Sequence, residues 1–97
     1  MFISLNKKFS KQRNKAPLEV KKAFAERLRL FMRDPFNPAL NNHSLQGKFK
    51  DMRSINITGD WRALYSERSG SEASYSEDES NQVIIFELLG THSKLYK

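Results

Sequence analysis

Cysteine is absent from this 97-residue chain. The chain can therefore form neither disulfide bonds nor a cysteine-ligated metal site, and this absence is compatible with a reducing compartment. No apolar stretch approaches the roughly 18 residues that cross a membrane, and the N-terminal segment lacks the apolar core of a secretion signal. We therefore expect a cytoplasmic protein with no membrane association.

Histidine is scarce as well, with only two residues in the chain.

Hydrophobic residues make up 38% of the 97 positions, which is enough to build one core but not two. A single domain spanning residues 1–97 is expected.

Acidic residues are outnumbered, with 11 Asp and Glu against 17 Lys and Arg, a net charge of +6. Ten of the basic residues lie within residues 1–33, whereas five of the acidic residues lie between Glu67 and Glu79. A positive field of this kind attracts phosphate backbones or an acidic protein partner. The ordinary alternative is a solvated helix face that lysine keeps soluble.

The first half of the chain predicts one short strand and two helices. The segment Phe2–Leu5 is strand-forming, and Asn6 can cap a basic helix from Lys7 to about Lys15. Pro17 suits the first position of a second helix that ends near Arg33. The apolar residues of this second helix recur at the spacings of an amphipathic helix, namely at Val20, Ala23, Phe24, Leu28 and Phe31.

The second half predicts three strands. Residues 52–58 and 61–67 alternate between apolar and polar side chains and are joined by a tight hairpin turn at 58–60. Residues 82–89 are apolar enough to form a central strand, and the acidic segment 69–81 is expected to be a flexible loop before it. The order β-α-α-β-β-β indicates an α+β domain with two helices packed on one face of a small, mostly antiparallel sheet.

The candidate functional residues fit RNA cleavage without a metal. In that reaction the ribose 2′-OH attacks the adjacent phosphate, which requires a base, an acid and cations that stabilise the developing charge. Histidine suits both proton-transfer roles, while aromatic and basic side chains hold bases and phosphates. The chain offers these groups at His43, Lys48, Arg53, Asp60, Trp61, Arg62, His92 and Tyr96.

Three motifs, in this order and spacing, resemble the YafQ branch of the RelE/ParE toxin superfamily. They are an H-x-L-x-G sequence at 43–47, an Asp-Trp hairpin at 60–61 and a terminal G-T-H-x-x-L-aromatic sequence at 90–96. Members of the branch are bacterial type II toxins that cleave mRNA on the ribosome and are silenced by a bound antitoxin. The resemblance covers nearly the whole chain and implies the RelE/ParE-like fold, that activity, an antitoxin partner and no cofactor or metal.

The resemblance also implies which residues act. His43, Asp60 and His92 fall on positions of the branch's motifs, and Tyr96 falls on an aromatic position that is commonly phenylalanine. Asn56 stands where catalytically described members carry a further histidine, and an amide cannot transfer protons at neutral pH.

Arg62 falls where RelE carries a functional arginine and YafQ an apolar residue. We expect Arg62 to neutralise developing charge, His92 to be the general acid, and Tyr96 to stack on a base or steady the phosphate. His43 and Asp60 are both candidates for the base. The residues expected to contact RNA are Lys48, Lys50, Arg53 and Trp61, although Trp61 can instead serve as hairpin packing.

Two alternatives remain. One is a toxin that binds a protein target without cleaving RNA, as ParE-type members do. The other is an inactive module that still binds an antitoxin, which the substitution at Asn56 favours. In each case we expect a monomer when free and a hetero-oligomer with the antitoxin.

Overall fold

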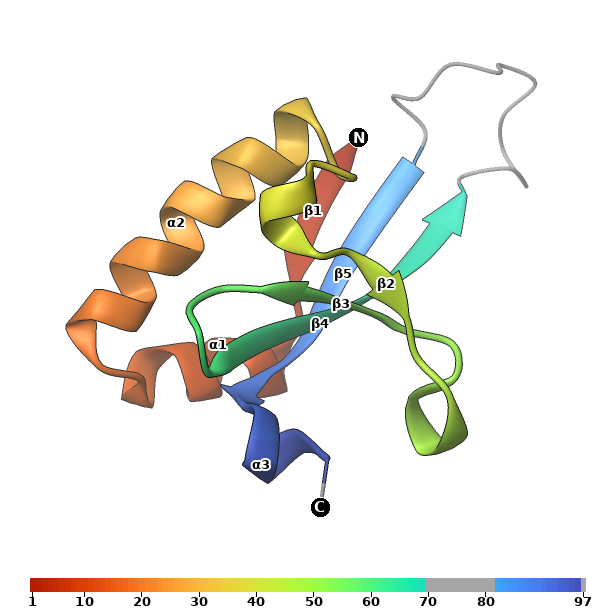
Figure 1. Ribbon diagram of the computed structural model, residues 1–97. Helices are drawn as coiled ribbons and strands as arrows, with labels where there is room; N and C mark the ends of the chain where they lie inside the picture. The colour runs from red at the N-terminus through yellow and green to blue at the C-terminus, as the bar shows by residue number, and fades with distance from the viewer. Residues whose placement is uncertain (70–81, 97) are drawn as a thin grey trace.

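The computed structural model describes residues 1–69 and 82–96. The elements, in chain order, are β1 (Phe2–Leu5), α1 (Lys7–Lys15), α2 (Leu18–Arg33), the 3-10 helix η1 (Pro38–Leu40), β2 (His43–Ser44), the 3-10 helix η2 (Gly47–Phe49), β3 (Arg53–Asn56), β4 (Trp61–Ser69), β5 (Gln82–Thr91) and α3 (His92–Leu95). Figure 1 shows this arrangement. No helix among the described residues is long and apolar enough to span a membrane.

The strands form a five-stranded sheet in the order β1-β5-β4-β3-β2. The strand β1 is parallel to β5, and the three other neighbouring pairs are antiparallel. The helices α1 and α2 lie together on one side of this sheet (Figure 1). The predicted α+β class, with two helices on one face of a mostly antiparallel sheet, is confirmed. The last strand has neighbours on both sides, as its apolar sequence predicted.

Local signals define the ends of both helices. The Asn6 side chain accepts a hydrogen bond of 2.8 Å from the Phe9 N–H, which satisfies one of the free donors at the start of α1. Pro17 immediately precedes α2 and does not form its first residue, a shift of one position from the prediction. The helix ends before Asp34, whose following proline disfavours helical backbone there.

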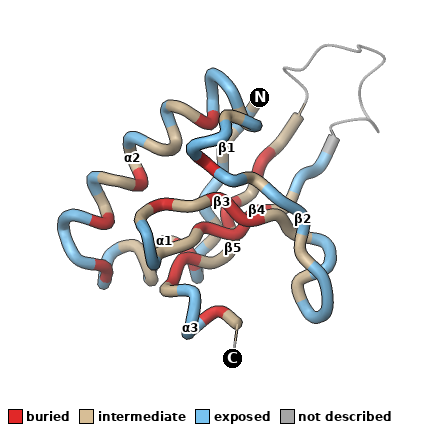
Figure 2. Tube along the Cα trace, in the orientation of Figure 1, coloured by how far each residue is buried: buried red, intermediate tan, exposed pale blue. Residues whose placement is uncertain are grey.

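An aromatic cluster forms the core between the helices and the sheet. The ring of Phe86 on β5 lies 5.5 to 5.8 Å, centroid to centroid, from the rings of Phe9, Phe24, Phe31 and Tyr65. All five of these side chains are almost fully buried, and the buried positions run along the inner strands in Figure 2. Offset and edge-on aromatic pairs of this kind add to the stabilisation from burial itself.

The register of the strands assigns each side chain to a face. Ala63 is fully buried in the core on the helix side. Its neighbour Arg62 pairs with Asn56 on β3 and with Gly90 on β5. Because successive side chains of a strand alternate between faces, Arg62 and Asn56 lie on the face away from α1 and α2.

Some elements were not predicted from the sequence. The segment 38–49 contains η1, the two-residue strand β2 and η2, and none of these three elements was predicted. The last strand continues to Thr91 and is followed by the short helix α3. The loop expected at 69–81 falls, from residue 70 onward, outside the described residues.

The helix α3 covers one end of the sheet face away from α1 and α2. A Cβ atom at Gly90 would lie 3.3 Å from the Leu95 side chain, so this side chain packs directly on the glycine. The Thr91 hydroxyl caps α3, and the His92 N–H donates to the Asp60 carbonyl at 2.9 Å. The C-terminal segment is therefore anchored to the sheet and to the β3–β4 turn.

Candidate active site

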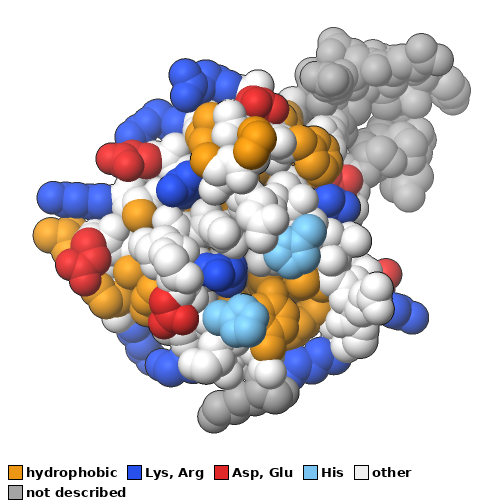
Figure 3. Space-filling model, viewed as in Figure 1, with side chains coloured by type: hydrophobic (Ala, Val, Ile, Leu, Met, Phe, Trp, Pro, Cys, Tyr) orange, Lys and Arg blue, Asp and Glu red, His pale blue; other side chains and the backbone are white. Residues whose placement is uncertain are grey.

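A pocket of about 360 Å³ opens on the sheet face away from α1 and α2. Its walls come from the connection before β3, from β3 and β4, and from α3. Both histidine side chains of the chain lie on the face shown in Figure 3. The lining residues are Asn41, His43, Leu45, Ser54, Arg62, His92 and Tyr96.

His43 enters the pocket from β2, where it pairs with Ser54 of β3. Its ring atom Nδ1 lies 2.8 Å from the Asn41 carbonyl oxygen. A carbonyl oxygen only accepts hydrogen bonds, so Nδ1 carries the proton in this contact. The neutral ring then has its lone pair on Nε2, which is the state a general base needs. Asn41 itself has a φ of 47°, a left-handed conformation that asparagine tolerates better than most residues.

A partly buried network of hydrogen bonds holds β2 in place. The Asn42 side-chain amide donates to the Tyr65 hydroxyl at 2.8 Å and to the Pro35 carbonyl at 2.9 Å. Its oxygen accepts a 2.8 Å hydrogen bond from Nε of Arg53. Burial raises the pKa of the Tyr65 phenol, against the smaller opposing effect of its hydrogen bond with Asn42. The Arg53 guanidinium lies 5.2 Å from the centre of the Phe36 ring and therefore points away from the pocket.

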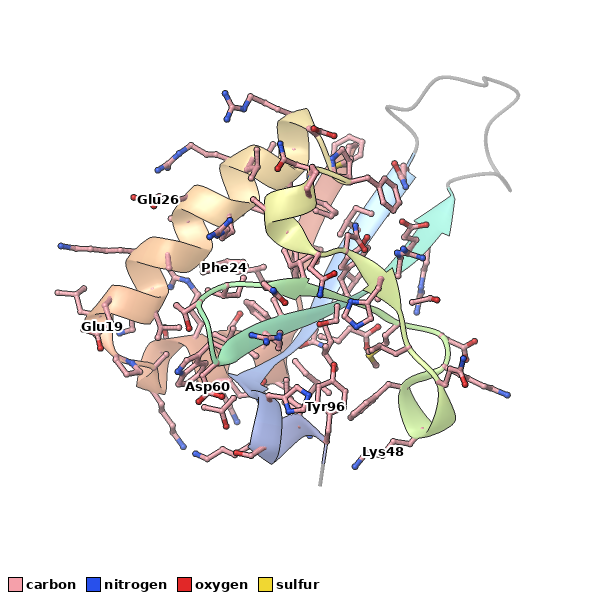
Figure 4. The ribbon with its side chains drawn as sticks, viewed as in Figure 1. Glu19, Phe24, Glu26, Lys48, Asp60 and Tyr96 are labelled. Atoms are coloured by element: carbon pink, nitrogen blue, oxygen red, sulfur yellow. The ribbon has the colours of Figure 1, made fainter. Side chains whose placement is uncertain are left out.

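His92 and Tyr96 also line the pocket. Their positions four residues apart place them on the same side of α3, with ring centroids 4.7 Å apart. The Tyr96 ring also meets the Phe49 ring of η2 edge-on at 6.0 Å. Figure 4 shows Tyr96 at the end of α3. His92 is exposed, so its ring is accessible to a ligand.

Arg62 supplies positive charge to the pocket. Its guanidinium donates to the carbonyl oxygens of Thr58 and Trp61, each at 3.0 Å, and to that of Gly59 at 3.3 Å. Within residues 1–69 and 82–96, no carboxylate forms an ion pair with it. The backbone thus holds the side chain in place while its charge stays uncompensated, an arrangement that favours an anion in the pocket.

Two buried polar atoms near Arg62 lack hydrogen-bond partners among the described residues. They are the hydroxyl oxygen of Ser54 and the amide oxygen of Asn56. Ser54 is fully buried and contributes to the wall of the pocket. Sequence reasoning did not single out Ser54 or Asn41. The strand alternation could have indicated Ser54, because it places that residue on the same face as Asn56.

The other predicted site residues lie outside this pocket. Asp60 is exposed in the turn, and its carbonyl rather than its carboxylate contacts His92. Trp61 packs against the core on the opposite face. Lys48 and Lys50 are exposed on the η2 segment, and the Lys48 ammonium lies 5.0 Å from the Phe49 ring centre. No group of three or more potential metal ligands occurs among the residues described here.

No protein-family model matches the chain, and no curated protein matches it either. Several solved structures match over nearly its full length. YafQ from Escherichia coli is 20% identical with a TM-score of 0.65, and the alignment covers 98% of this chain and 97% of YafQ. YafQ has also been solved in a toxin–antitoxin complex with DinJ, with a TM-score of 0.59, 22% identity and coverage of 98% of this chain and 96% of that one.

Two further structures have the same architecture. A YoeB/ParE toxin from Agrobacterium tumefaciens is 17% identical with a TM-score of 0.69, and the alignment covers 95% of this chain and 99% of the toxin. A copper-bound mutant toxin from Helicobacter pylori is 26% identical with a TM-score of 0.59, and 99% of each chain is covered. The chain therefore has the fold of the RelE/ParE toxin superfamily, with structural similarity to YafQ, as its motifs predicted.

Proposed function

We propose that this chain is the toxin of a bacterial type II toxin–antitoxin pair and that it cleaves mRNA on the ribosome without a metal. The observation that carries the proposal is the placement of two histidines, from β2 and α3, in the lining of one pocket that also contains an arginine with no acidic partner among the described residues. Such a set supplies a base, an acid and a cation for phosphoryl transfer to an internal hydroxyl.

His43 acts as the general base in this proposal. Its Nδ1–H is held by the Asn41 carbonyl, so Nε2 can accept the proton of the ribose 2′-OH. The 2′ oxygen then attacks the adjacent phosphorus and forms a 2′,3′-cyclic phosphate. Sequence reasoning left Asp60 as an equal candidate, and its position outside the pocket favours His43.

His92 acts as the general acid. As the bond between phosphorus and the 5′ oxygen breaks, its imidazolium donates a proton to the departing oxygen. The guanidinium of Arg62 stabilises the charge on the phosphorane, and Tyr96 contacts the phosphate or a base. The Tyr96 ring also restricts the His92 side chain, because the two rings are in contact.

Asn56 does not take part in proton transfer. Its amide oxygen is buried beside Arg62, and in this proposal the two histidines of the pocket carry both proton transfers. This asparagine is the main support for the alternative of an inactive module that still binds an antitoxin. Cleavage by the parent chain would exclude that alternative.

Two partners follow from the proposal. The pocket holds little more than the reacting nucleotides, so the ribosome must present the mRNA strand in an in-line geometry, and free RNA should be cut poorly. YafQ forms a complex with DinJ, and we propose that this chain likewise binds a cognate antitoxin. The basic helices and a net charge of +6 favour an acidic segment in that antitoxin.

Induced expression in bacteria, with and without the open reading frame beside the gene, tests the proposal. Growth should stop only without the neighbouring frame, and mapped mRNA 5′ ends should show cuts inside coding regions. The variant His92→Gln should abolish the cuts, whereas Lys22→Gln, an exposed charge change on α2, should not. Growth arrest by His92→Gln without cuts would indicate the binding-only toxin instead.

A further inference from the structure

A second pocket, of about 190 Å³, lies where α1, β4, β5 and α3 meet. It is separate from the candidate active site, because none of its lining residues also lines that pocket. The residues that line it are Gln12, Lys15, Trp61, Leu89, Gly90 and Lys94. None of these is acidic.

Trp61 gives this pocket an aromatic wall. The indole packs partly against the core and is only half-buried, so part of its surface remains accessible from the pocket. Leu89 and the Gly90 backbone complete the apolar side. A ring so supported can accept a flat ligand by stacking with little loss of side-chain freedom, since the core already restricts it.

The polar side of the pocket presents donors. The Gln12 side-chain oxygen accepts a 2.8 Å hydrogen bond from the Leu89 N–H, which fixes the orientation of the amide. Its NH₂ group has no acceptor among the described residues and can donate to a ligand. Lys15 at the end of α1 and Lys94 on α3 add two ammonium groups. An aromatic wall with an amide donor and two cations matches a nucleotide.

The second pocket lies close to the active site along the chain. Trp61 and Arg62 are consecutive on β4 and point to opposite faces. Lys94 lies between His92 and Tyr96 on α3, and these two residues line the active site. The short helix α3 is thus shared by both pockets, and an RNA strand that passes it can contact both.

We propose that this pocket binds the base of an mRNA nucleotide flanking the scissile step, with the base on Trp61 and its phosphate near Lys15 and Lys94. This inference rests on the proposed function and adds a subsite to it. An acidic peptide would pair its carboxylates with the two lysines, but carboxylates do not stack on an indole. The aromatic wall therefore favours RNA.

Trp61 is the only tryptophan in the chain, so its fluorescence reports on this pocket alone. The probe is a short RNA with 2′-O-methyl groups, which cannot be cut because its 2′ oxygens are blocked. Binding should quench the emission. The double variant Lys15→Gln/Lys94→Gln should weaken binding roughly five- to a hundred-fold and lower its salt dependence. The matched double variant Lys21→Gln/Lys22→Gln, on α2, should change the salt dependence less.

Two further probes distinguish an RNA base from an acidic peptide as the ligand of this pocket. An oligonucleotide with abasic sites at the flanking positions should bind more weakly and leave the emission unquenched. Equal quenching by that oligonucleotide, or by polyglutamate, would overturn the assignment to a base. Unchanged emission on addition of RNA that the protein binds would overturn it as well.

The same titration on His92→Gln distinguishes this inference from the proposed function. If the RNA probe quenches the Trp61 emission but the parent chain does not cleave mRNA, the base subsite is supported and the ribonuclease activity is contradicted. If the parent chain cleaves mRNA but Trp61→Phe and the lysine variants bind the RNA probe as the parent does, the proposed subsite is contradicted. The proposed ribonuclease activity is then unaffected. A thermal melt of each variant checks that the fold is retained.

Discussion

The two faces of the sheet differ in what their side chains do. On the helix side, Phe86 and its aromatic neighbours are buried against one another, and the Tyr65 hydroxyl among them accepts a hydrogen bond from the Asn42 side chain. On the other face, the same strands carry Arg62, with no acidic partner among the described residues, and the buried Ser54 hydroxyl, with no hydrogen-bond partner there. One face therefore supplies stability, and the other keeps polar groups available for a ligand.

Removing the central ring of the helix-side face should have the largest effect. Phe86→Ala deletes a side chain in contact with four other aromatic rings, so the free energy of unfolding should fall by about 3–5 kcal/mol. Chemical denaturation measures this change. The control Phe2→Ala, at a residue 67% exposed, should cost less than about 1 kcal/mol. Similar losses for both variants would contradict the assignment of the core.

Changing the charge on the pocket face should affect rate more than stability. Arg62→Gln should lower the rate of mRNA cleavage on ribosomes about 10²- to 10³-fold, because a preorganised donor to the developing charge is lost. The matched change Arg29→Gln, on the exposed surface of α2, should leave the rate within a few fold. A rate for Arg62→Gln equal to that of the parent would show that the arginine only holds the turn.

The buried Ser54 hydroxyl allows the two faces to be distinguished by stability measurements. Ser54→Ala removes an oxygen that has no hydrogen-bond partner among the described residues, so the free energy of unfolding should stay level or rise by about 1 kcal/mol. Ala63→Ser places a hydroxyl on the helix side and should cost about 1–3 kcal/mol. Thermal and denaturant melts compare the two. A clear loss of stability for Ser54→Ala would mean that its hydroxyl is bonded in solution.

The smallest expected effect concerns the Tyr65 phenol, which links the core to β2. Burial raises its pKa in the folded chain, so folding favours the neutral form. The associated stabilisation is complete below the pKa of the unfolded chain and is lost as the pH rises through the folded pKa. Tyr65→Phe should therefore lose less stability than the parent at alkaline pH. An identical alkaline loss would exclude the phenol as its cause.

Much of the fold could be predicted from local signals. The Asn6 cap, the helical spacing of Phe24 and Phe31, and the alternation in β4 each agree with the structure. The short elements could not be predicted in this way. The strand β2 has two residues and α3 has four, too few to show a period. The position of α3 depends on the contact of Leu95 with Gly90, a contact between elements that local sequence does not reveal.

The residues of the candidate site were likewise predicted only in part from the sequence. The motifs indicated His43, Arg62, His92 and Tyr96, and the structure places these four around one pocket, although their roles remain predictions. Trp61 lies on the opposite face because it is adjacent to Arg62 in a strand, where side chains alternate.

Arg53 and Asp60 also lie outside the pocket. Composition showed that Arg53 carries a charge but not that the Asn42 side chain holds its guanidinium away from the pocket. The motif indicated the Asp60 carboxylate, whereas the folded chain uses the Asp60 backbone to anchor His92.

The pH dependence of single-turnover mRNA cleavage on ribosomes tests most directly whether His43 and His92 act as base and acid. The parent should give a bell-shaped profile. His43→Gln and His92→Gln should each be about two to four powers of ten slower. The first should lose the acidic limb and the second the alkaline limb. A bell-shaped pH–rate profile of unchanged height and shape in either variant would contradict the assignment of His43 as base and His92 as acid.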